Sequence, residues 1–169
     1  MKYLKKLTLA TGLLLLLPAI APATDSAPTR YQQMVDHYEA IRLALLGDSL
    51  LGVELHAGEL KAKAADLRQN LSAEAAGIPA ELLEKGAEAL ETIETSATRL
   101  TKVTDIESAR KQFFDLTKPM AKYRKLAGDQ STFVAYCSMA QKAWMQPEGE
   151  LGNPYMGQKM PKCGEVVSE

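Results

Sequence analysis

Sulfur-bearing side chains gather near the C-terminal end of the chain. Thiolates and thioethers are soft donors, and as a set they favour Cu(I) or Ag(I) over magnesium, calcium or manganese. The pattern therefore predicts a soft-metal site with Cys137, Met139, Met160 and Cys163 as ligands and Met156 as an additional one. The full set holds both cysteines and four of the seven methionines: Cys137, Met139, Met145, Met156, Met160 and Cys163.

The same two cysteines can instead form a disulfide. Two cysteines allow one pairing, Cys137 with Cys163, and such a bond persists outside the cytoplasm. Methionine is also a common filler beneath irregular loops. A disulfide and a thiolate metal site exclude each other at any one moment. Both interpretations therefore stay open, as does a metal site gated by its redox state.

Histidine chemistry and enzyme motifs give little support to catalysis. His37 and His56 are the two histidines of the chain, and such residues in helices are most often boundary or hydrogen-bonded core residues. We expect no haem, because Cys-x-x-Cys-His is missing and Met34 with His56 is the one candidate pair of axial ligands. Gly-x-Ser-x-Gly, His-Glu-x-x-His and phosphate-binding glycine loops are also missing. We therefore expect no enzyme activity.

The first residues predict export. Three lysines (Lys2, Lys5 and Lys6) precede an apolar run over residues 7–17, and small residues follow it. This is typical of a signal peptide and too short to span a membrane. We predict a signal peptide over residues 1–23 and a flexible linker over 24–30. No cysteine directly follows the apolar run to carry a lipid, so we expect a soluble periplasmic protein without a membrane anchor.

Composition narrows the class of partner and fold. Removal of the signal peptide leaves 17 basic residues of the original 20 against 21 acidic ones, without a basic tail, so we expect no nucleic-acid partner. The remaining length suits one domain. Aromatic residues make up 6% of the chain, and alanine and leucine are abundant, which favours helices.

Apolar residues recur at steps of three and four along residues 31–127, which places them on single helix faces. Short connections between such segments favour antiparallel neighbours. We predict an all-α, up-down-up-down four-helix bundle over residues 31–127. The four seams are Tyr31, Met34, Tyr38, Ile41 and Leu45; Val53, Ala57, Leu60, Ala64 and Leu67; Leu83, Gly86, Leu90, Ile93, Ala97 and Leu100; and Ile106, Ala109, Phe113, Leu116, Met120 and Tyr123.

Residues 128–169 differ in character from the rest. Glycine and proline interrupt them every few residues, and proline removes an amide donor and clashes with the preceding helical turn. We predict an irregular C-terminal loop segment that belongs to the same domain and packs on the bundle. Trp144 and Tyr155 are its expected anchors.

This segment carries an ordered set of motifs. Tyr136-Cys137-Ser138-Met139-Ala140 is followed by Trp144, by Asn153-Pro154-Tyr155-Met156-Gly157, and then by Met160 and Cys163-Gly164. The order resembles the C-terminal signature of a periplasmic family of domains of unknown function. That family occurs alone or appended to the periplasmic adaptor subunits of copper/silver efflux pumps of the resistance-nodulation-division type. Ser138 departs from the proline usual there, and Met156 from a commoner aromatic or other residue.

The resemblance implies a helical domain with the tail folded over it and a role in heavy-metal handling. Two functions are expected. One is a Cu(I)/Ag(I)-binding protein beside an efflux system, with Trp144 as a cation–π cap or as packing. The other is a disulfide-stapled interaction module that docks to an envelope protein such as an efflux adaptor. In both, the residues assigned to the turn are Asn153, Pro154, Tyr155, Gly157 and Gly164.

Overall fold

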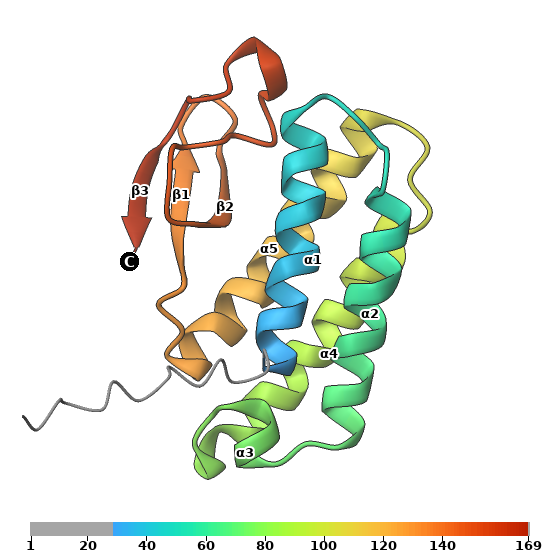
Figure 1. Ribbon diagram of the computed structural model, residues 1–169, viewed down its shortest axis with the longest axis vertical. Coiled ribbons are helices and arrows are strands. Elements are labelled where there is room, and N and C mark those ends of the chain that lie inside the picture. Colours follow the sequence, from blue (N-terminus) through green and yellow to red (C-terminus); the bar gives the residue numbers. More distant parts are fainter. Residues whose placement is uncertain (1–28, 169) are drawn as a thin grey trace, which may run out of the picture.

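The computed structural model describes residues 29–168, in which four long helices stand side by side (Figure 1). The predicted signal peptide and residues 24–28 of the predicted linker lie outside the described residues. The long helices are α1 (Arg30–Leu46), α2 (Val53–Gln69), α4 (Leu83–Leu100) and α5 (Ile106–Ala127). The short helix α3 (Ala73–Ala76) and the 3₁₀ turn η1 (Ala80–Leu82) connect α2 to α4.

The long helices lie where the apolar spacing predicts them. The α2 seam from Val53 to Leu67 is buried throughout. Complete burial of a leucine or isoleucine side chain contributes about 1.5–3 kcal/mol. A capping side chain contributes about 1 kcal/mol; Asp105, for example, accepts a hydrogen bond from the Ser108 amide at 2.8 Å to begin α5. Packing of these faces therefore stabilises the bundle more than its caps do.

Successive long helices run in opposite directions (Figure 1). The α1 helix packs on α2 and α5, and α4 packs on the same two helices, so the four surround one apolar core. Among residues 29–168, no helix combines the length and the apolar character that a membrane crossing requires.

The all-α prediction is wrong, because the C-terminal segment contains a three-stranded antiparallel sheet. Its strands are β1 (Thr132–Cys137), β2 (Lys142–Pro147) and β3 (Glu165–Ser168), in the order β2-β1-β3. Glycine and proline exclude a long helix here but permit short strands. Pro147 ends β2, an edge strand, where the missing amide donor costs little. The segment between β2 and β3 remains irregular apart from one 3₁₀ turn, η2 (Gly157–Lys159).

The sheet packs against α1 and α5 through β2. Trp144 and Met145 of β2 are fully buried and belong to the same apolar core as the helices. The Tyr38 hydroxyl of α1 accepts a hydrogen bond from the Met145 amide at 3.1 Å. It donates to the Thr117 hydroxyl of α5 at 2.7 Å, since that hydroxyl itself donates to the carbonyl of Phe113. One tyrosine thus ties the hairpin to two helices.

Candidate functional site

Cys137 and Cys163 lie beside each other at one end of the sheet. Cys137 ends β1 and is fully buried, whereas Cys163 precedes β3 and is half-buried. The strands β1 and β3 pair with Tyr136 opposite Glu165, and this register brings the two cysteines together. Their Sγ atoms are 2.7 Å apart as unbonded thiols. A disulfide measures about 2.05 Å, so a small side-chain adjustment suffices to join them.

The surroundings of the two thiols shift their pKa values in opposite directions. Burial raises the pKa of Cys137, but hydrogen bonds from Cys163, from the Ala140 and Met139 amides and from the Asn153 side chain outweigh it and hold the pKa below its usual value. The hydrogen bond to Cys137 is the main cause that raises the pKa of Cys163, followed by burial and the charge on Cys137. The pair therefore favours a thiolate at Cys137 and a thiol at Cys163.

Asn153 organises the segment around the cysteines and is fully buried. Its side-chain amide donates to the carbonyl of Cys163 at 2.7 Å. Its side-chain oxygen accepts hydrogen bonds from the backbone amides of Tyr155 and Met156 at 2.8 and 3.1 Å. Its backbone amide donates to the carbonyl of Pro161 at 2.7 Å. The predicted turn role of Asn153 thus has a physical basis: one side chain sets the Asn153–Met156 turn and holds the backbone beside Cys163.

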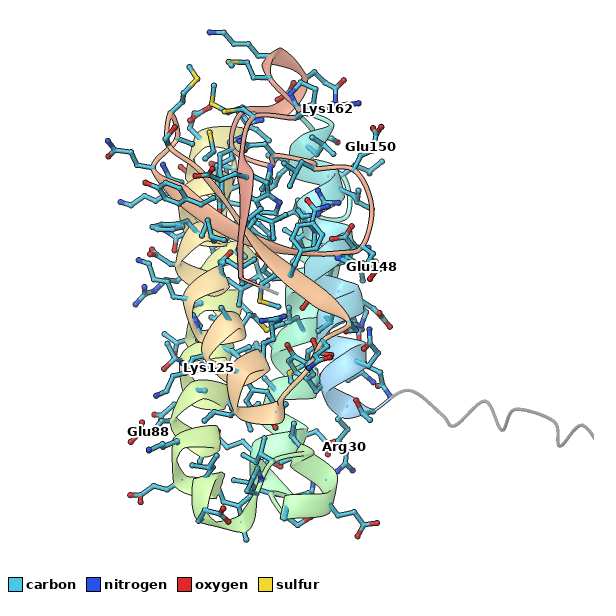
Figure 2. All side chains as sticks on the ribbon, turned by 90° about the vertical axis from the view of Figure 1, so that its left-hand side faces the viewer. Arg30, Glu88, Lys125, Glu148, Glu150 and Lys162 are labelled. Carbon is cyan, nitrogen blue, oxygen red and sulfur yellow. The ribbon has the colours of Figure 1, made fainter. Side chains whose placement is uncertain are left out.

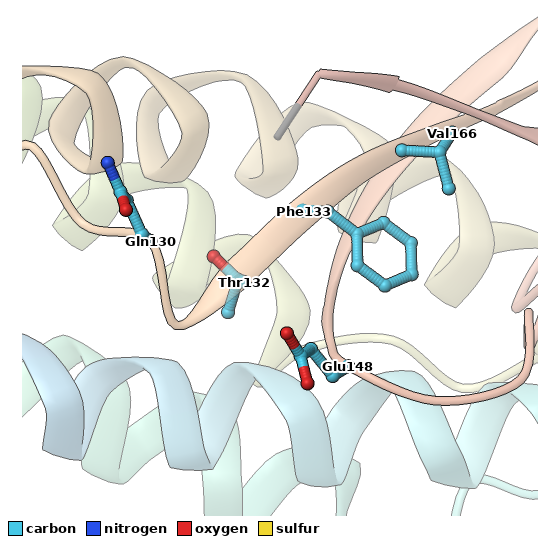
Figure 3. Close-up of a pocket in the computed structure, with 5 residues that line it drawn as sticks. All are labelled: Gln130, Thr132, Phe133, Glu148 and Val166. Atoms are coloured by element: carbon cyan, nitrogen blue, oxygen red, sulfur yellow. The ribbon is translucent and has the colours of Figure 1, made fainter.

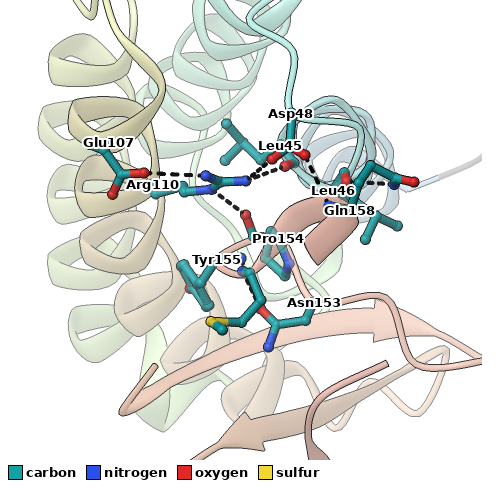
Figure 4. Close-up of polar contacts among 10 residues, drawn as sticks. Leu45, Leu46, Asp48, Glu107, Arg110, Asn153, Pro154, Tyr155 and Gln158 are labelled. Carbon is teal, nitrogen blue, oxygen red and sulfur yellow. Dashed lines mark hydrogen bonds and ion pairs between the residues drawn. The ribbon is translucent and has the colours of Figure 1, made fainter. Parts of the chain in front are cut away.

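Arg110 of α5 joins this turn to the bundle (Figure 4). Its guanidinium donates to the carbonyls of Pro154 at 2.8 Å and Leu45 at 3.1 Å, and it forms ion pairs with Asp48 at 2.5 Å and Glu107 at 3.3 Å. Arg110 therefore bridges the Asn153–Met156 turn and the C-terminal end of α1. A buried cation with several acceptors is expensive to leave unpaired, so these contacts fix the position of the turn.

Asp48, in the α1–α2 connection, binds the tail at residues 157 and 158. Hydrogen bonds from the Gln158 amide, at 3.0 Å, and from Arg110 lower the pKa of the Asp48 carboxyl. Gly157 lies against this carboxylate with a φ of +54°, and a Cβ there would overlap it. Glycine is therefore required at 157 both for its backbone conformation and for space.

Two further arginines fix the tail at other points. Arg42 of α1 is buried, pairs with Glu39 at 2.6 Å and donates to the carbonyl of Gly152 at 2.5 Å. Arg124 of α5 donates through Nε and Nη2 to the carbonyl of Thr132 at the start of β1, with the Nε bond at 2.9 Å. The tail is thus held by charged side chains that bind its backbone.

Trp144 acts as packing. Its ring is fully buried, lies edge-on to Tyr155 with centroids 6.2 Å apart, and donates its indole N–H to Gln146 at 2.8 Å. A Cβ at Gly164 would come within 2.6 Å of the indole ring, so this glycine permits the β3 segment to cross it. The Tyr155 hydroxyl donates to the carbonyl of Ala143 at 2.6 Å. These aromatic side chains anchor the tail as predicted.

The predicted methionine ligands are less closely grouped. Met139, 63% exposed, and the half-buried Met156 border one shallow pocket, which Arg110, Lys111 and Lys142 also line. Met160 is half-buried, and its carbonyl accepts from the Cys163 amide at 3.2 Å. Sulfur atoms gather at the end of the molecule that carries the β1–β2 turn and η2 (Figure 2). Met145, in contrast, is a core residue.

Other surface features add no ligands to this set. Within residues 29–168, no group of three or more histidine, cysteine, aspartate and glutamate side chains is arranged to hold a metal ion. A hollow beside β1 contains one carboxylate and no sulfur (Figure 3). It is lined by Gln130, Thr132, Phe133, Glu148 and Val166. Among the described residues, the soft donors of the C-terminal segment are therefore the cysteine pair and the methionines of the same segment.

The comparisons with known proteins found no match for this chain. It matches no family model, and no curated protein and no solved structure is significantly similar to it. The resemblance of the tail to the efflux-associated periplasmic family therefore stays a prediction.

Proposed function

We propose that this protein is an exported heavy-metal-handling protein that binds Cu(I) or Ag(I) as cargo through Cys137 and Cys163. The observation that carries the proposal is the pair of adjacent thiols, with hydrogen bonds that favour a thiolate at Cys137. Their Sγ atoms, 2.7 Å apart, must separate for both to bind one ion. Thiolates are the ligands that soft monovalent ions prefer, and metal binding requires the deprotonated form.

The surroundings suit a bound ion. Cys163 borders a surface hollow lined by Tyr136, Ser138, Gly164 and Glu165, which gives an ion a route to the sulfurs. Two thiolates and one monovalent cation carry a net charge of −1. The ammonium groups of Lys111 and Lys142 near Met139 and Met156 offset part of that charge, whereas Arg110 is already paired with Asp48 and Glu107. The two thioethers supply further soft donors at the same end of the molecule.

Competition for Cu(I) tests this proposal. The reduced protein is titrated against a chromogenic Cu(I) chelator without oxygen, in parallel with the Cys137→Ser/Cys163→Ser double variant. We expect the double variant to lose at least about 100-fold in affinity, since both thiolates are removed. We expect Met139→Leu/Met156→Leu to lose about tenfold, while Met120→Leu, in the buried face of α5, binds as wild type. Unchanged binding by the cysteine double variant would refute the site.

A second candidate function is a disulfide-stapled interaction module that docks to an envelope protein such as an efflux adaptor. The same sulfur distance favours it, because two sulfurs that share one metal ion lie farther apart than 2.7 Å when each bond is about 2.3 Å long. Counting free thiols in protein taken directly from the periplasm separates the two candidates. Complete oxidation that mild reductant does not reverse supports the staple, and two free thiols support the metal site.

A further inference from the structure

The two histidines meet across the interface of α1 and α2. His37 Nδ1 and His56 Nδ1 are 3.1 Å apart, and both rings are half-buried. The two helices run antiparallel and side by side (Figure 1), and an ion pair between Arg30 and Asp66 at 3.0 Å ties them together toward the other end. The register of the helix pair therefore fixes the two rings opposite each other.

The His56 ring lies close to Gly52, the N-cap residue of α2. Gly52, which has a φ of +82°, faces the other edge of that ring. A Cβ at residue 52 would lie 3.3 Å from Cδ2 and 3.6 Å from Nε2 of His56. Glycine thus leaves room for the ring, and Nδ1 of His56 is directed at His37.

We propose that His37 and His56 form a two-histidine chelating site for a divalent transition-metal ion such as Cu(II) or Zn(II), bound through both Nδ1 atoms. Imidazole nitrogens bind these ions at about 2.0–2.1 Å. With such bonds, a separation of 3.1 Å corresponds to an angle at the metal of roughly 100°, between square-planar and tetrahedral values. In the metal-free pair one Nδ1 donates a hydrogen bond to the other, so metal binding moves that proton to Nε2 of the same ring while the Nδ1 spacing suits a chelate.

The charges around the pair allow a cation to bind. The carboxylates of Glu59 and Asp36 raise the pKa of His37, and the ammonium of Lys63 lowers it. Burial, followed by His56, lowers the pKa of His37, which keeps its ring neutral and its lone pair available at neutral pH. Because two protein ligands leave the remaining positions to solvent, the bound ion exchanges readily.

This site is independent of the proposed cysteine site, and its donors are of a different class. Imidazole suits borderline divalent ions, whereas thiolates and thioethers select Cu(I) or Ag(I). The two sites lie on different elements, α1 and α2 against the sheet and its flanking loop.

Paramagnetic resonance with Cu(II) tests the chelate in the Cys137→Ser/Cys163→Ser background, where no thiol can reduce or bind the ion. We expect hyperfine coupling from two imidazole nitrogens at one equivalent of Cu(II). Each of His37→Gln and His56→Gln should weaken Cu(II) binding at least about tenfold. The control is Lys61→Gln, an exposed position on α2, and it should leave Cu(II) binding unchanged. Equal binding by the histidine variants, or coupling to fewer than two nitrogens, overturns the proposal.

A second measurement needs no substitution of a histidine. In the same background, ¹⁵N spectra of the imidazoles are recorded as Zn(II) is added, with Mg(II) as the control ion. We expect the Nδ1 resonances of both rings to shift together with Zn(II) and to stay in place with Mg(II). A shift at Nε2 alone, or at one ring alone, contradicts chelation through both Nδ1 atoms.

Discussion

The helical bundle and the C-terminal segment, residues 128–168, share one apolar core but are held by different interactions. The bundle buries long apolar seams, as in α2, where Leu60 and Leu67 are fully buried. The tail adds few apolar side chains to that core and is fastened by polar ones. Arg42, Arg110 and Asn153 donate to its backbone carbonyls at 2.5–2.8 Å.

This difference separates two kinds of stability. Apolar contacts tolerate small displacements, whereas a buried polar group that loses its partner pays a desolvation penalty of about 1–3 kcal/mol. The tail is therefore more sensitive to the loss of single polar side chains. Trp144 is the one tryptophan of the chain and lies in β2, so its fluorescence reports on the tail while far-ultraviolet circular dichroism reports on the helices.

The largest expected effect is in the bundle. Leu90→Ala removes a fully buried side chain of α4 and should lower the free energy of unfolding by about 3–5 kcal/mol. Because the tail rests on the same core, urea unfolding should move to lower concentration equally by fluorescence and by circular dichroism. Glu91→Ala, exposed on the same helix, is the control and should change stability little. A shift in circular dichroism alone would mean that the two regions fold separately.

Reduction of the cysteine pair is the next largest effect. When Cys137 and Cys163 are joined, the bond closes a loop between residues 26 positions apart. A loop of that length contributes about 3–4 kcal/mol in the chain-entropy model. Adding reductant to oxidised protein should therefore shift the fluorescence transition to lower urea. The Cys163→Ser variant should give the same curve with and without reductant, and a response from that variant would point to another cause.

Asn153→Ala should cost about 2–3 kcal/mol, because it leaves the amides of Tyr155 and Met156 and the carbonyl of Cys163 without their partner. We expect the fluorescence transition to precede the circular dichroism transition, since the lost contacts lie within the tail. Asn70→Ala, at the exposed C-terminal cap of α2, is the matched control and should shift both transitions together by less than about 1 kcal/mol. Coincident transitions in the Asn153 variant would show that the tail does not unfold on its own.

The smallest effect concerns pH and the bundle. Burial, followed by His56, lowers the pKa of folded His37 from its unfolded value of 6.5. The unfolded chain therefore binds more protons as pH falls below 6.5, and the stability present above that pH is lost. We expect a decrease below about 1 kcal/mol between pH 7.5 and 5.5, because the ring is partly exposed. His37→Gln should flatten this part of the profile, and an equal slope in that variant would assign the change to other groups.

The sequence predicted the helices well because their apolar periodicity directly reflects burial. Tyr38, Ile41 and Leu45 are spaced for one face of α1, and all three are buried there. The sheet was missed because its strands bury residues irregularly. In β1 the buried positions are Thr132, Ala135 and Cys137, which do not alternate.

The polar contacts that fix the candidate site could not be predicted from the sequence either. Arg42 and Arg110 occupy helical positions where a charged residue ordinarily faces solvent, and their carbonyl partners lie 110 and 44 residues away. The cysteine pairing was accessible, since two cysteines allow one pair, and the structure places their sulfurs in contact. Whether oxidation or a metal ion joins them depends on the environment of the chain, which side-chain spacing does not encode.

The bond between Arg42 and Gly152 also orders events during synthesis. Arg42 is made early, and its carbonyl acceptor follows 110 residues later. Contacts between such distant segments form late, because closing the intervening loop costs entropy before the contact repays it. Until residue 152 has emerged, the first helix carries a guanidinium without that acceptor. The arrival of the tail therefore gives Arg42 its remaining acceptor, and a chain cut short before residue 152 keeps only the pair with Glu39.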